Sequence, residues 1–300
     1  MRIGLYRGDA ASGPIDKILD AARDAAAAGY TSFWLPQTMG MDAMAVLAVV
    51  GREVPGIDLG TAVVPTYPRH PVVMAQQALT AQSISGGRFI LGIGLSHQPL
   101  IEGSFGYSFD KPIRHMREYL DALLPLVREG SVQVAGETIT ARATLDVRGS
   151  SPVQVLLAAL GPQMLQLAGA RADGTVTWMC GPSTLEQHVV PTITAAASEA
   201  GREAPVIGAG FPVCVTDDPD GARSAAASTF AIYGSLPSYQ AMLAREGAEG
   251  PADVAIVGDE AVVGAQLDEL RAIGVTDFVA SVFGSADDRA RTYAYLASLL

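Results

Sequence analysis

The feature that most constrains the fold of this chain is a regular alternation of short β-type runs with longer amphipathic or alanine-rich segments. The first unit is a β-type run over residues 3–6, followed by a helical stretch over 15–28 that Gly29 ends. Similar units recur about eight times, and parallel strands joined by right-handed crossovers can close into a barrel. The alternation therefore predicts an α/β fold of the (β/α)8 TIM barrel type, with an open doubly wound sheet as the alternative.

The same pattern sets the expected bounds of the elements. Expected strands span residues 3–6, 32–35, 57–64, 89–93, 153–158, 175–179, 206–215, 254–257 and 277–283. Expected helices span residues 15–28, 41–51, 71–85, 113–128, 162–172, 183–200 and 260–272, with a last helix ending at Leu300.

Two departures from the regular alternation are also expected. A small hairpin insertion should lie at 132–140 with its turn at Ala135-Gly136. After Asp217 the pattern loosens, which predicts an extended region between the seventh and eighth strands. No linker or low-complexity tract divides the chain, so residues 1–300 are expected to form a single domain.

Composition argues against several classes of partner. The chain is 49% apolar and 17% charged, so it can bury a large core, and its net charge of -11 without a run of Lys and Arg argues against nucleic acid. Charged residues interrupt every apolar stretch, which leaves nothing near the roughly 20 residues of a membrane span. Residues 1–6 have no signal-peptide pattern, so we expect a cytoplasmic protein. Cys180 and Cys214 lack metal-ligand spacing and are expected to be buried or semi-buried thiols, with no metal site.

The active site of such a barrel is built at the C-terminal ends of the strands and in the loops that follow them. Few residues at the expected strand ends ionise. The scarcity of Asp, Glu and Lys argues against paired-carboxylate hydrolysis, a metal site or a Schiff-base lysine. It favours a bound cofactor that supplies the chemistry.

Two short motifs suggest other activities, and both are rejected. GIGLSH at residues 92–97 begins like a dinucleotide-binding loop, but it ends in His97, and no helix is expected to start at Gln98-Pro99. Ser96 beside His97 could suggest a hydrolase, yet no Gly stands at position 98 to complete a nucleophile elbow.

Six segments carry a resemblance to a known family: LGTAVVP at 59–65, PRHP at 68–71, GGRFILGIG at 86–94, AALGP at 158–162, AGARADG at 168–174 and VGDE at 257–260. They follow one another along nearly the whole chain. Together they resemble the bacterial luciferase-like monooxygenase superfamily, whose members are (β/α)8 barrels.

Within that superfamily, WLPQ at 34–37 and VVPTYPRHP at 63–71 look most like the branch that uses coenzyme F420, a deazaflavin. The resemblance implies an oxidoreductase that transfers a hydride between the deazaflavin and a small organic substrate. The first alternative is an FMN-dependent monooxygenase on the same barrel. The second is a cofactor-free binding protein that inherited the barrel, since fold does not imply function.

The resemblance implies a cis peptide bond, not preceding proline, at about Ala62-Val63, in a bulge behind the deazaflavin ring. Without the family, a strand end turned by Pro65 explains this segment equally well. The resemblance also places residues 95–97 beside the ring. Leu160-Gly161 and the N-terminus of the next helix are expected to hold the cofactor phosphate, because free amides and the helix dipole attract an anion.

The residues expected at the cofactor are Gln37, Thr61, Ala62, Val63, Gly94, Leu95, Ser96, His97, Ala159, Leu160, Gly161, Pro162, Arg114 and Trp178. Two of them have an equally good structural explanation. Arg114 could reach the cofactor phosphate or lie on a solvated helical face. Trp178, at a strand end, could line the cofactor site or complete a hydrophobic core.

His97 and Thr38 are the candidate catalytic residues. They stand where the deazaflavin sugar-phosphate dehydrogenases carry a Glu and a His, so the substrate of that branch is not expected. His97 could exchange the proton that accompanies hydride transfer, because imidazole titrates near neutral pH, or it could only line the pocket. Arg69 is expected to pair with a carboxylate across the rim of the barrel.

The expected partners are a small-molecule substrate and a second copy of the chain. Relatives are commonly dimers, and the apolar helix at 41–50 is one candidate face for a homodimer, although ordinary barrel packing explains it equally well. Substrate choice is expected to depend on the loops at 98–111 and 233–250.

Overall fold

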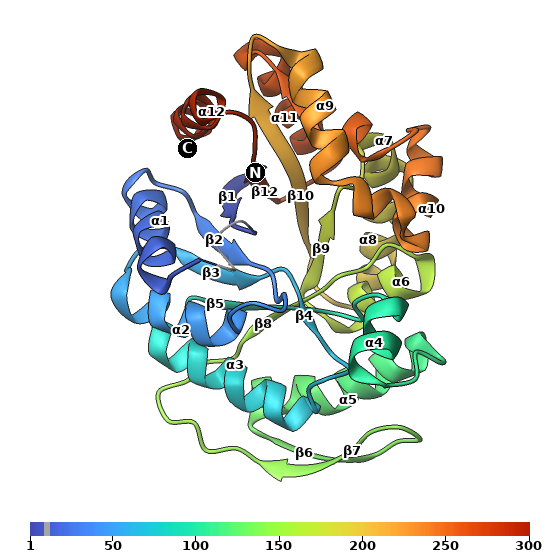
Figure 1. The fold of residues 1–300 in the computed structure, drawn as a ribbon. Coiled ribbons are helices and arrows are strands. Elements are labelled where there is room, and N and C mark those ends of the chain that lie inside the picture. Colours follow the sequence, from blue (N-terminus) through green and yellow to red (C-terminus); the bar gives the residue numbers. More distant parts are fainter. Residues whose placement is uncertain (9–12) are drawn as a thin grey trace.

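Parallel strands form a closed barrel with helices around it (Figure 1). The computed structural model describes residues 1–8 and 13–300. In this part of the chain the barrel strands are, in order, β1 (Arg2–Tyr6), β2 (Ser32–Leu35), β3 (Asp58–Thr61), β5 (Phe89–Gly94), β8 (Gln154–Leu157), β9 (Gly174–Trp178), β10 (Val206–Val215) and β12 (Asp277–Val282). The pairings of β12 with β1 and of β9 with β10 close the sheet. The TIM barrel prediction is confirmed, and the open doubly wound sheet is excluded.

The helices lie outside the strands and alternate with them along the chain (Figure 1). They are α1 (Ile15–Ala27), α2 (Ala43–Glu53), α3 (Pro71–Ser85), α4 (Gln98–Phe105), α5 (Pro112–Glu129), α6 (Pro162–Arg171), α7 (Pro182–Thr184), α8 (Val190–Glu199), α9 (Pro219–Thr229), α10 (Pro237–Glu246), α11 (Glu260–Ile273) and α12 (Ala286–Ser298). Among the described residues, no helix combines the length and the apolar character needed to cross a membrane.

Local capping explains where several helices begin and end. The side chains of Asp42 and Asp259 accept hydrogen bonds from the first-turn amides of α2 and α11, and Ser285 forms a capping box with Asp288 at α12. Helices α3, α5 and α6 carry proline in the first turn, where its missing N–H group costs nothing.

The alternation of side chains along each strand creates two apolar layers. One layer lies between the strands and the helices and contains Phe33, Leu91 and Phe278. The other fills the barrel itself and includes Trp34, which is 1% exposed. The Trp34 indole N–H donates to Ser32 Oγ at 2.8 Å. Its large ring fits inside the barrel because the neighbouring strand has glycine at position 60.

Two charged residues of the family-like segments hold the N-terminal end of the barrel together. Arg88, just before β5, donates to the carbonyl groups of Gly51 and Ile57 at 2.7 and 2.5 Å. Asp173, just before β9, accepts hydrogen bonds from Arg128 and Arg202 at 2.8 and 3.1 Å. Both contacts lie at the opposite end of the barrel from the strand ends where chemistry is expected.

The hairpin insertion is present, but its expected bounds are wrong. β6 (Ser131–Ala135) pairs with β7 (Thr140–Thr144) on the outer side of α5 (Figure 1). Residues 137–139, expected to start the second strand, instead form the turn. Their three N–H groups donate to the carboxylate of Glu118 on α5, which removes them from the strand ladder.

The extended region before the last barrel strand is confirmed. It contains α9, two 3₁₀ turns, η3 (Ala231–Ser235) and η4 (Pro251–Val254), α10, the short strand β11 (Ile256–Gly258) and α11. The strand expected at 254–257 starts later, because η4 includes Val254. β11 pairs with Val213–Val215 of β10, whereas β9 pairs with residues 206–210 near the start of the same strand. β11 is therefore an additional strand and not one of the eight barrel strands.

Two further expectations about local structure are wrong, and a third is confirmed with one irregularity. The strand expected at 57–64 is interrupted after Thr61 and resumes as β4 (Val64–Pro65), which pairs with β5. Helix α4 does start at Gln98, because Pro99 suits a first helical turn. The dinucleotide-binding fold is still excluded, because the strands form a closed barrel. The helix expected at 183–200 is present as α7 and α8, with a π turn, η2 (Leu185–Val189), between them.

Candidate functional site

The C-terminal strand ends meet at one end of the barrel, and unusual backbone conformations gather there. The peptide bond between Ala62 and Val63 is cis, as expected from the family resemblance. Ser96, after β5, and Met179, after β9, have φ values of 63° and 50°. Residues other than glycine that adopt this left-handed conformation concentrate at functional sites, because the surrounding structure must enforce it. We call this end of the barrel the mouth.

The bulge after β3 divides the predicted cofactor residues into two groups. Thr61 is fully buried, and its hydroxyl group both donates to the Gly92 carbonyl at 2.8 Å and accepts from the Gly92 N–H at 2.9 Å. Its side chain therefore bridges β3 and β5. Ala62 and Val63 are half-buried and join the apolar cluster inside the barrel. These two residues are the part of the bulge that a ligand could contact.

The side chain of Gln37 holds the start of α2, whereas that of Thr38 makes a contact within its own loop. The Gln37 side-chain oxygen accepts from the Ala43 N–H at 3.0 Å, and Thr38, which is exposed, accepts from the Gly40 N–H at 3.2 Å. Arg69 forms an ion pair with Asp42, which confirms that it pairs with a carboxylate across the rim. The roles of Gln37 in cofactor binding and of Thr38 in catalysis stay predictions.

His97 lies at the mouth as the N-cap residue of α4, and its side chain is half-buried. Burial lowers the pKa of the imidazole, which is therefore neutral at pH 7. Within the described residues its ring nitrogens make no hydrogen bond, and its ring centroid lies 6.0 Å from that of Tyr239. His97 is thus a neutral, polar group at the mouth whose ring nitrogens are available to a ligand.

A chain of aromatic rings crosses the mouth. Tyr6 of β1 stacks on Trp178 of β9 at 5.1 Å, Trp178 meets Tyr233 of η3 at 6.0 Å, and Tyr233 meets Tyr239 of α10 at 4.9 Å. Burial, reinforced by the neighbouring tyrosines, raises the pKa of Tyr6 and of Tyr239, so both stay neutral phenols. Residues 231–246, here called the α10 segment, therefore cover the strand ends with aromatic side chains.

The Trp178 side chain also carries a polar group without a partner. Its Nε1 atom is buried near the Tyr233 hydroxyl group, but no acceptor among the described residues meets hydrogen-bond geometry. Trp178 is the last residue of β9 and lies at the mouth, and its role in cofactor binding stays a prediction. Tyr233 and Tyr239 lie in the loop at 233–250 that is expected to set substrate choice, but the sequence did not single out these two side chains, because nothing in it shows which strand ends the loop covers.

The loop after β8 offers a site for an anion. Gly161 is the N-cap residue of α6 and is exposed, and a Cβ atom built on it would meet nothing within 4 Å. The main-chain N–H groups of Gly161, Gln163 and Met164 have no hydrogen-bond partner in the described residues. Pro162, between them, has no N–H group. The first turn of α6 is thus free to bind a phosphate group.

The next helix N-terminus around the barrel is already filled from within the chain. Glu246, at the end of α10, accepts hydrogen bonds from the Ser183 and Thr184 N–H groups at 3.1 and 2.8 Å, and from Thr184 Oγ1 at 2.8 Å. A Cβ atom at Gly181 would overlap this carboxylate. Of these two adjacent helix N-termini, only that of α6 is open.

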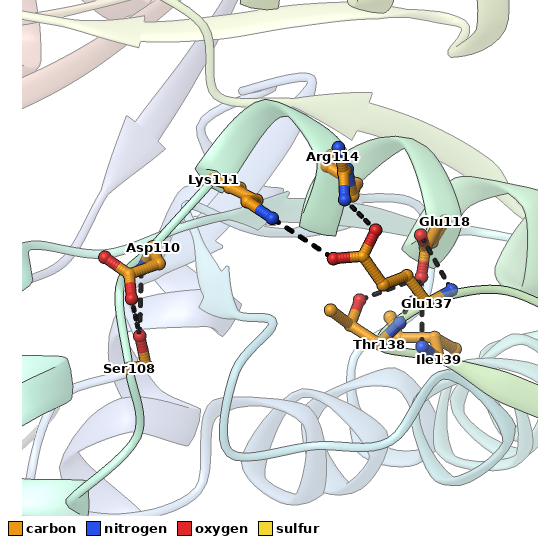
Figure 2. Close-up of polar contacts among 8 residues, drawn as sticks. All are labelled: Ser108, Asp110, Lys111, Arg114, Glu118, Glu137, Thr138 and Ile139. Carbon is orange, nitrogen blue, oxygen red and sulfur yellow. Dashed lines mark hydrogen bonds and ion pairs between the residues drawn. The ribbon is translucent and has the colours of Figure 1, made fainter.

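Arg114 is directed away from the barrel axis, toward the hairpin. Figure 2 shows its ion pair with Glu137, which also takes the Lys111 ammonium group at 3.2 Å. Glu118, one helical turn after Arg114, binds the turn amides of the same hairpin (Figure 2). The guanidinium group is therefore engaged at the surface, and its proposed contact with the cofactor phosphate stays a prediction.

A second aromatic cluster lies between the loop after β4 and α5, and sequence reasoning missed it. His115 stacks on Tyr67 with ring centroids 3.9 Å apart, and its Nε2 atom lies 3.0 Å from Thr66 Oγ1. Burial lowers the pKa of His115 to about 4, so it is not a cation at pH 7. Burial, followed by the charges of Asp110 and Glu102, raises the pKa of Tyr67 to about 12.

Cys180 and Cys214 are free and buried, as expected. Burial, and then the Glu246 carboxylate, raises the pKa of Cys180 to about 12, so this thiol is protonated at pH 7. Within residues 1–8 and 13–300, no three His, Cys, Asp or Glu side chains gather into a group that could hold a metal ion.

Comparison with known proteins gives one family and several relatives. A family model described as luciferase-like monooxygenase matches residues 4–286. The chain is 27% identical over 281 residues to the 5,10-methylenetetrahydromethanopterin reductase of Methanolobus tindarius, covering 92% of this chain and 85% of that protein. It is 31% identical over 188 residues to a putative coenzyme F420-dependent oxidoreductase of Mycobacterium tuberculosis, covering 58% and 54%. The coenzyme F420 dependent tetrahydromethanopterin reductase from Methanopyrus kandleri has a similar structure, with a TM-score of 0.81, 23% identity and 99% and 97% coverage.

Proposed function

Because the chain belongs to the luciferase-like monooxygenase family, we propose that it is an F420-dependent oxidoreductase that transfers a hydride between the deazaflavin and a small organic substrate. The observation that carries the proposal is the match to the family over residues 4–286, together with relatives named for coenzyme F420 or for a methanopterin reductase. Members of the family that are 27–31% identical to this chain thus favour a reductase over an oxygenase.

The residues at the mouth fit a flat ring that carries a phosphate group. Ala62, Val63, Gly94 and Ala158 lie next to one another and have no long or charged side chain, and a Cβ atom at Gly94 would lie 2.9 Å from Val63 Cγ2 and 3.2 Å from the Ala158 Cβ. The open N-terminus of α6 lies at the end of the neighbouring strand and would hold the phosphate through main-chain N–H groups. Ser96 would donate a hydrogen bond to a ring carbonyl group.

A bound deazaflavin supplies two-electron hydride transfer. The protein must then handle the proton that moves with the hydride. His97 is neutral at pH 7, because burial lowers its pKa, and its imidazole can take a proton from a substrate hydroxyl group. The aromatic rings of the α10 segment would exclude water from the mouth and favour a substrate with an apolar body.

A titration of the purified protein with F420, and separately with FMN, tests this proposal. Trp178 lies at the mouth and Trp34 inside the barrel, and they are the two tryptophans of the chain, so a ring bound beside Trp178 is expected to quench part of the emission. We expect F420 to bind at micromolar concentration and FMN to bind far more weakly. Tight FMN binding with no F420 affinity would support a monooxygenase, and failure of both to bind would support a cofactor-free protein.

Mass analysis of candidate substrates incubated with the F420-loaded protein then tests the reaction class. Hydride transfer changes the substrate mass by two hydrogens, whereas oxygen insertion adds one oxygen atom. The cytoplasmic location and the homodimer stay predictions, and size measurement in solution checks the second.

A further inference from the structure

A buried histidine on the helix after β9 contacts the loop that is proposed to hold the phosphate. His188 is 8% exposed, and its Nε2 atom lies 2.8 Å from the carbonyl oxygen of Leu160. A carbonyl oxygen can only accept a hydrogen bond, so the Nε2 atom carries the proton and donates. This bond joins η2 to the loop after β8.

The contact fixes the direction of the next amide. The Leu160 carbonyl group and the Gly161 N–H group belong to one trans peptide unit, in which they point in opposite directions. Because the carbonyl group points toward His188, the Gly161 N–H group points away from η2. No described residue accepts from that N–H group, and a Cβ atom built on Gly161 would meet nothing within 4 Å.

We propose that His188 is a positioning residue for the cofactor phosphate: it holds the Leu160 carbonyl group so that the Gly161 N–H group points at the anion. The inference rests on the proposed function, which supplies the phosphate group. His188 itself touches neither the phosphate nor the substrate.

The surroundings of His188 make it a rigid support. It lies on the π turn Leu185–Val189, and single π turns inside α-helices occur frequently at functional sites. Helix α8, which continues from this turn, packs directly on α6: a Cβ atom at Gly169 of α6 would overlap the Ile193 carbonyl oxygen and lie 3.0 Å from the Ala197 nitrogen. His188 and the first turn of α6 therefore keep a fixed relation to each other.

Loss of the histidine donor leaves the peptide unit free to rotate. Gly161 has no Cβ atom, so it can follow such a rotation without a steric penalty. A rotated unit would point the Leu160 carbonyl oxygen, and not the Gly161 N–H group, at the phosphate. The anion would then lose one donor and gain a repulsive dipole.

Paired binding measurements test the inference. We expect His188→Leu to weaken the binding of F420 at least about tenfold, while the binding of the phosphate-free deazaflavin changes less than about twofold. If the protein uses FMN, the same comparison is made with FMN and riboflavin. Equal losses for both members of a pair, or no loss for either, would overturn the proposal.

Two variants separate positioning from packing. His188→Gln keeps a donor at nearly the same reach and is expected to restore most of the affinity for the phosphorylated cofactor. Val189→Ala removes apolar volume from the same π turn without touching the hydrogen bond, and it is expected to leave the affinity ratio unchanged. A Val189→Ala variant that reproduces the His188→Leu ratio would show that the effect is loss of packing.

A measurement without cofactor separates this inference from the proposed function. In the apo protein labelled with ¹⁵N-glycine, the Gly161 amide signal, identified with Gly161→Ala, is expected to shift on titration with inorganic phosphate. His188→Leu is expected to abolish that shift. If the Gly161 signal of the wild-type protein shifts with phosphate but neither F420 nor FMN binds, only the proposed function is refuted. If a cofactor binds but the Gly161 signal does not shift, only the role of His188 is refuted. If neither cofactor binds and the signal does not move, both proposals fail.

Discussion

Replacing Gly60 by alanine should destabilise the barrel from the inside. Gly60 has an ordinary extended backbone, so the added methyl group causes no conformational strain of its own. Built on this backbone, it would overlap three carbon atoms of the Trp34 ring, and the most distant of them would be only 2.5 Å away. Unstrained carbon atoms pack at about 3.5–4.0 Å, so the overlap exceeds about 1 Å at each of the three atoms.

The Trp34 ring has little room to withdraw. Its N–H group is bonded to Ser32, and a Cβ at Gly4, on the other side, would lie 3.0 Å from the same Nε1 atom. Overpacking of a closed core lowers the free energy of unfolding by about 1–3 kcal/mol. Because the Trp34 ring cannot move away from the added methyl group, we expect a loss of about 3 kcal/mol. With an unfolding entropy of about 2.1 cal/mol/K per residue over the 300 residues, the Tm should fall by about 5 °C.

Thermal unfolding followed by circular dichroism measures this shift. Gly103→Ala is the matched control, because a Cβ atom there meets nothing within 4 Å and alanine favours the helix. A second change, Trp34→Leu, should recover part of the loss in the double variant, since the two side chains compete for the same volume. A Tm drop below about 1 °C for Gly60→Ala, or a double variant that is simply additive, would refute this account of the barrel interior.

Three further predictions concern the mouth and its supports. His97→Gln should lower kcat about 10²–10⁴-fold with little change in KM; a rise in KM alone would assign His97 to the pocket wall. Thr61→Val keeps the shape of the side chain but leaves the buried Gly92 N–H and carbonyl groups unpaired. Denaturant titration should therefore show that the free energy of unfolding falls by about 1–3 kcal/mol, whereas Thr38→Val, at an exposed position, should change it negligibly. His115 has its pKa lowered to about 4 by burial, so the folded state binds fewer protons than the unfolded state between pH 6.5 and 4, and stability falls as the pH drops through this window. His115→Phe should remove that part of the acid sensitivity, at most about 3 kcal/mol, and an unchanged pH profile would contradict the assignment.

The barrel could be predicted because its strands are buried on both sides and its helices on one. That difference appears in the sequence as short apolar runs alternating with amphipathic segments. Element ends were predicted less well wherever a side chain captures backbone groups. The hairpin shows this: Glu118 lies on α5, far from 137–139 in sequence, yet it decides where the second strand starts.

The site was predictable only where it depends on local backbone chemistry or on family resemblance. The open turn at Gly161 belongs to the first kind of feature. The Ala62-Val63 bulge belongs to the second, because without the family resemblance a strand end turned by Pro65 explains that segment equally well. Tyr233 and Tyr239 reach the mouth through tertiary packing of a loop region, which no periodicity encodes. His188 escaped notice because a π turn adds a single residue to an otherwise regular amphipathic helix.

The family-like segments also contain residues that do not serve the site. Arg88 and Asp173 stand in two of the most recognisable segments, but they bind carbonyl groups and arginines at the far end of the barrel. These segments therefore identify the fold more reliably than they identify the residues that take part in the reaction.

The α10 segment comes from a single insertion between the last two barrel strands, whereas the proposed cofactor contacts come from the earlier strands. The protein is therefore modular in a practical sense. Exchange of this one stretch of chain could give the enzyme a new substrate while the cofactor stays in place. A replacement segment would have to keep Glu246, because its carboxylate binds the first turn of α7.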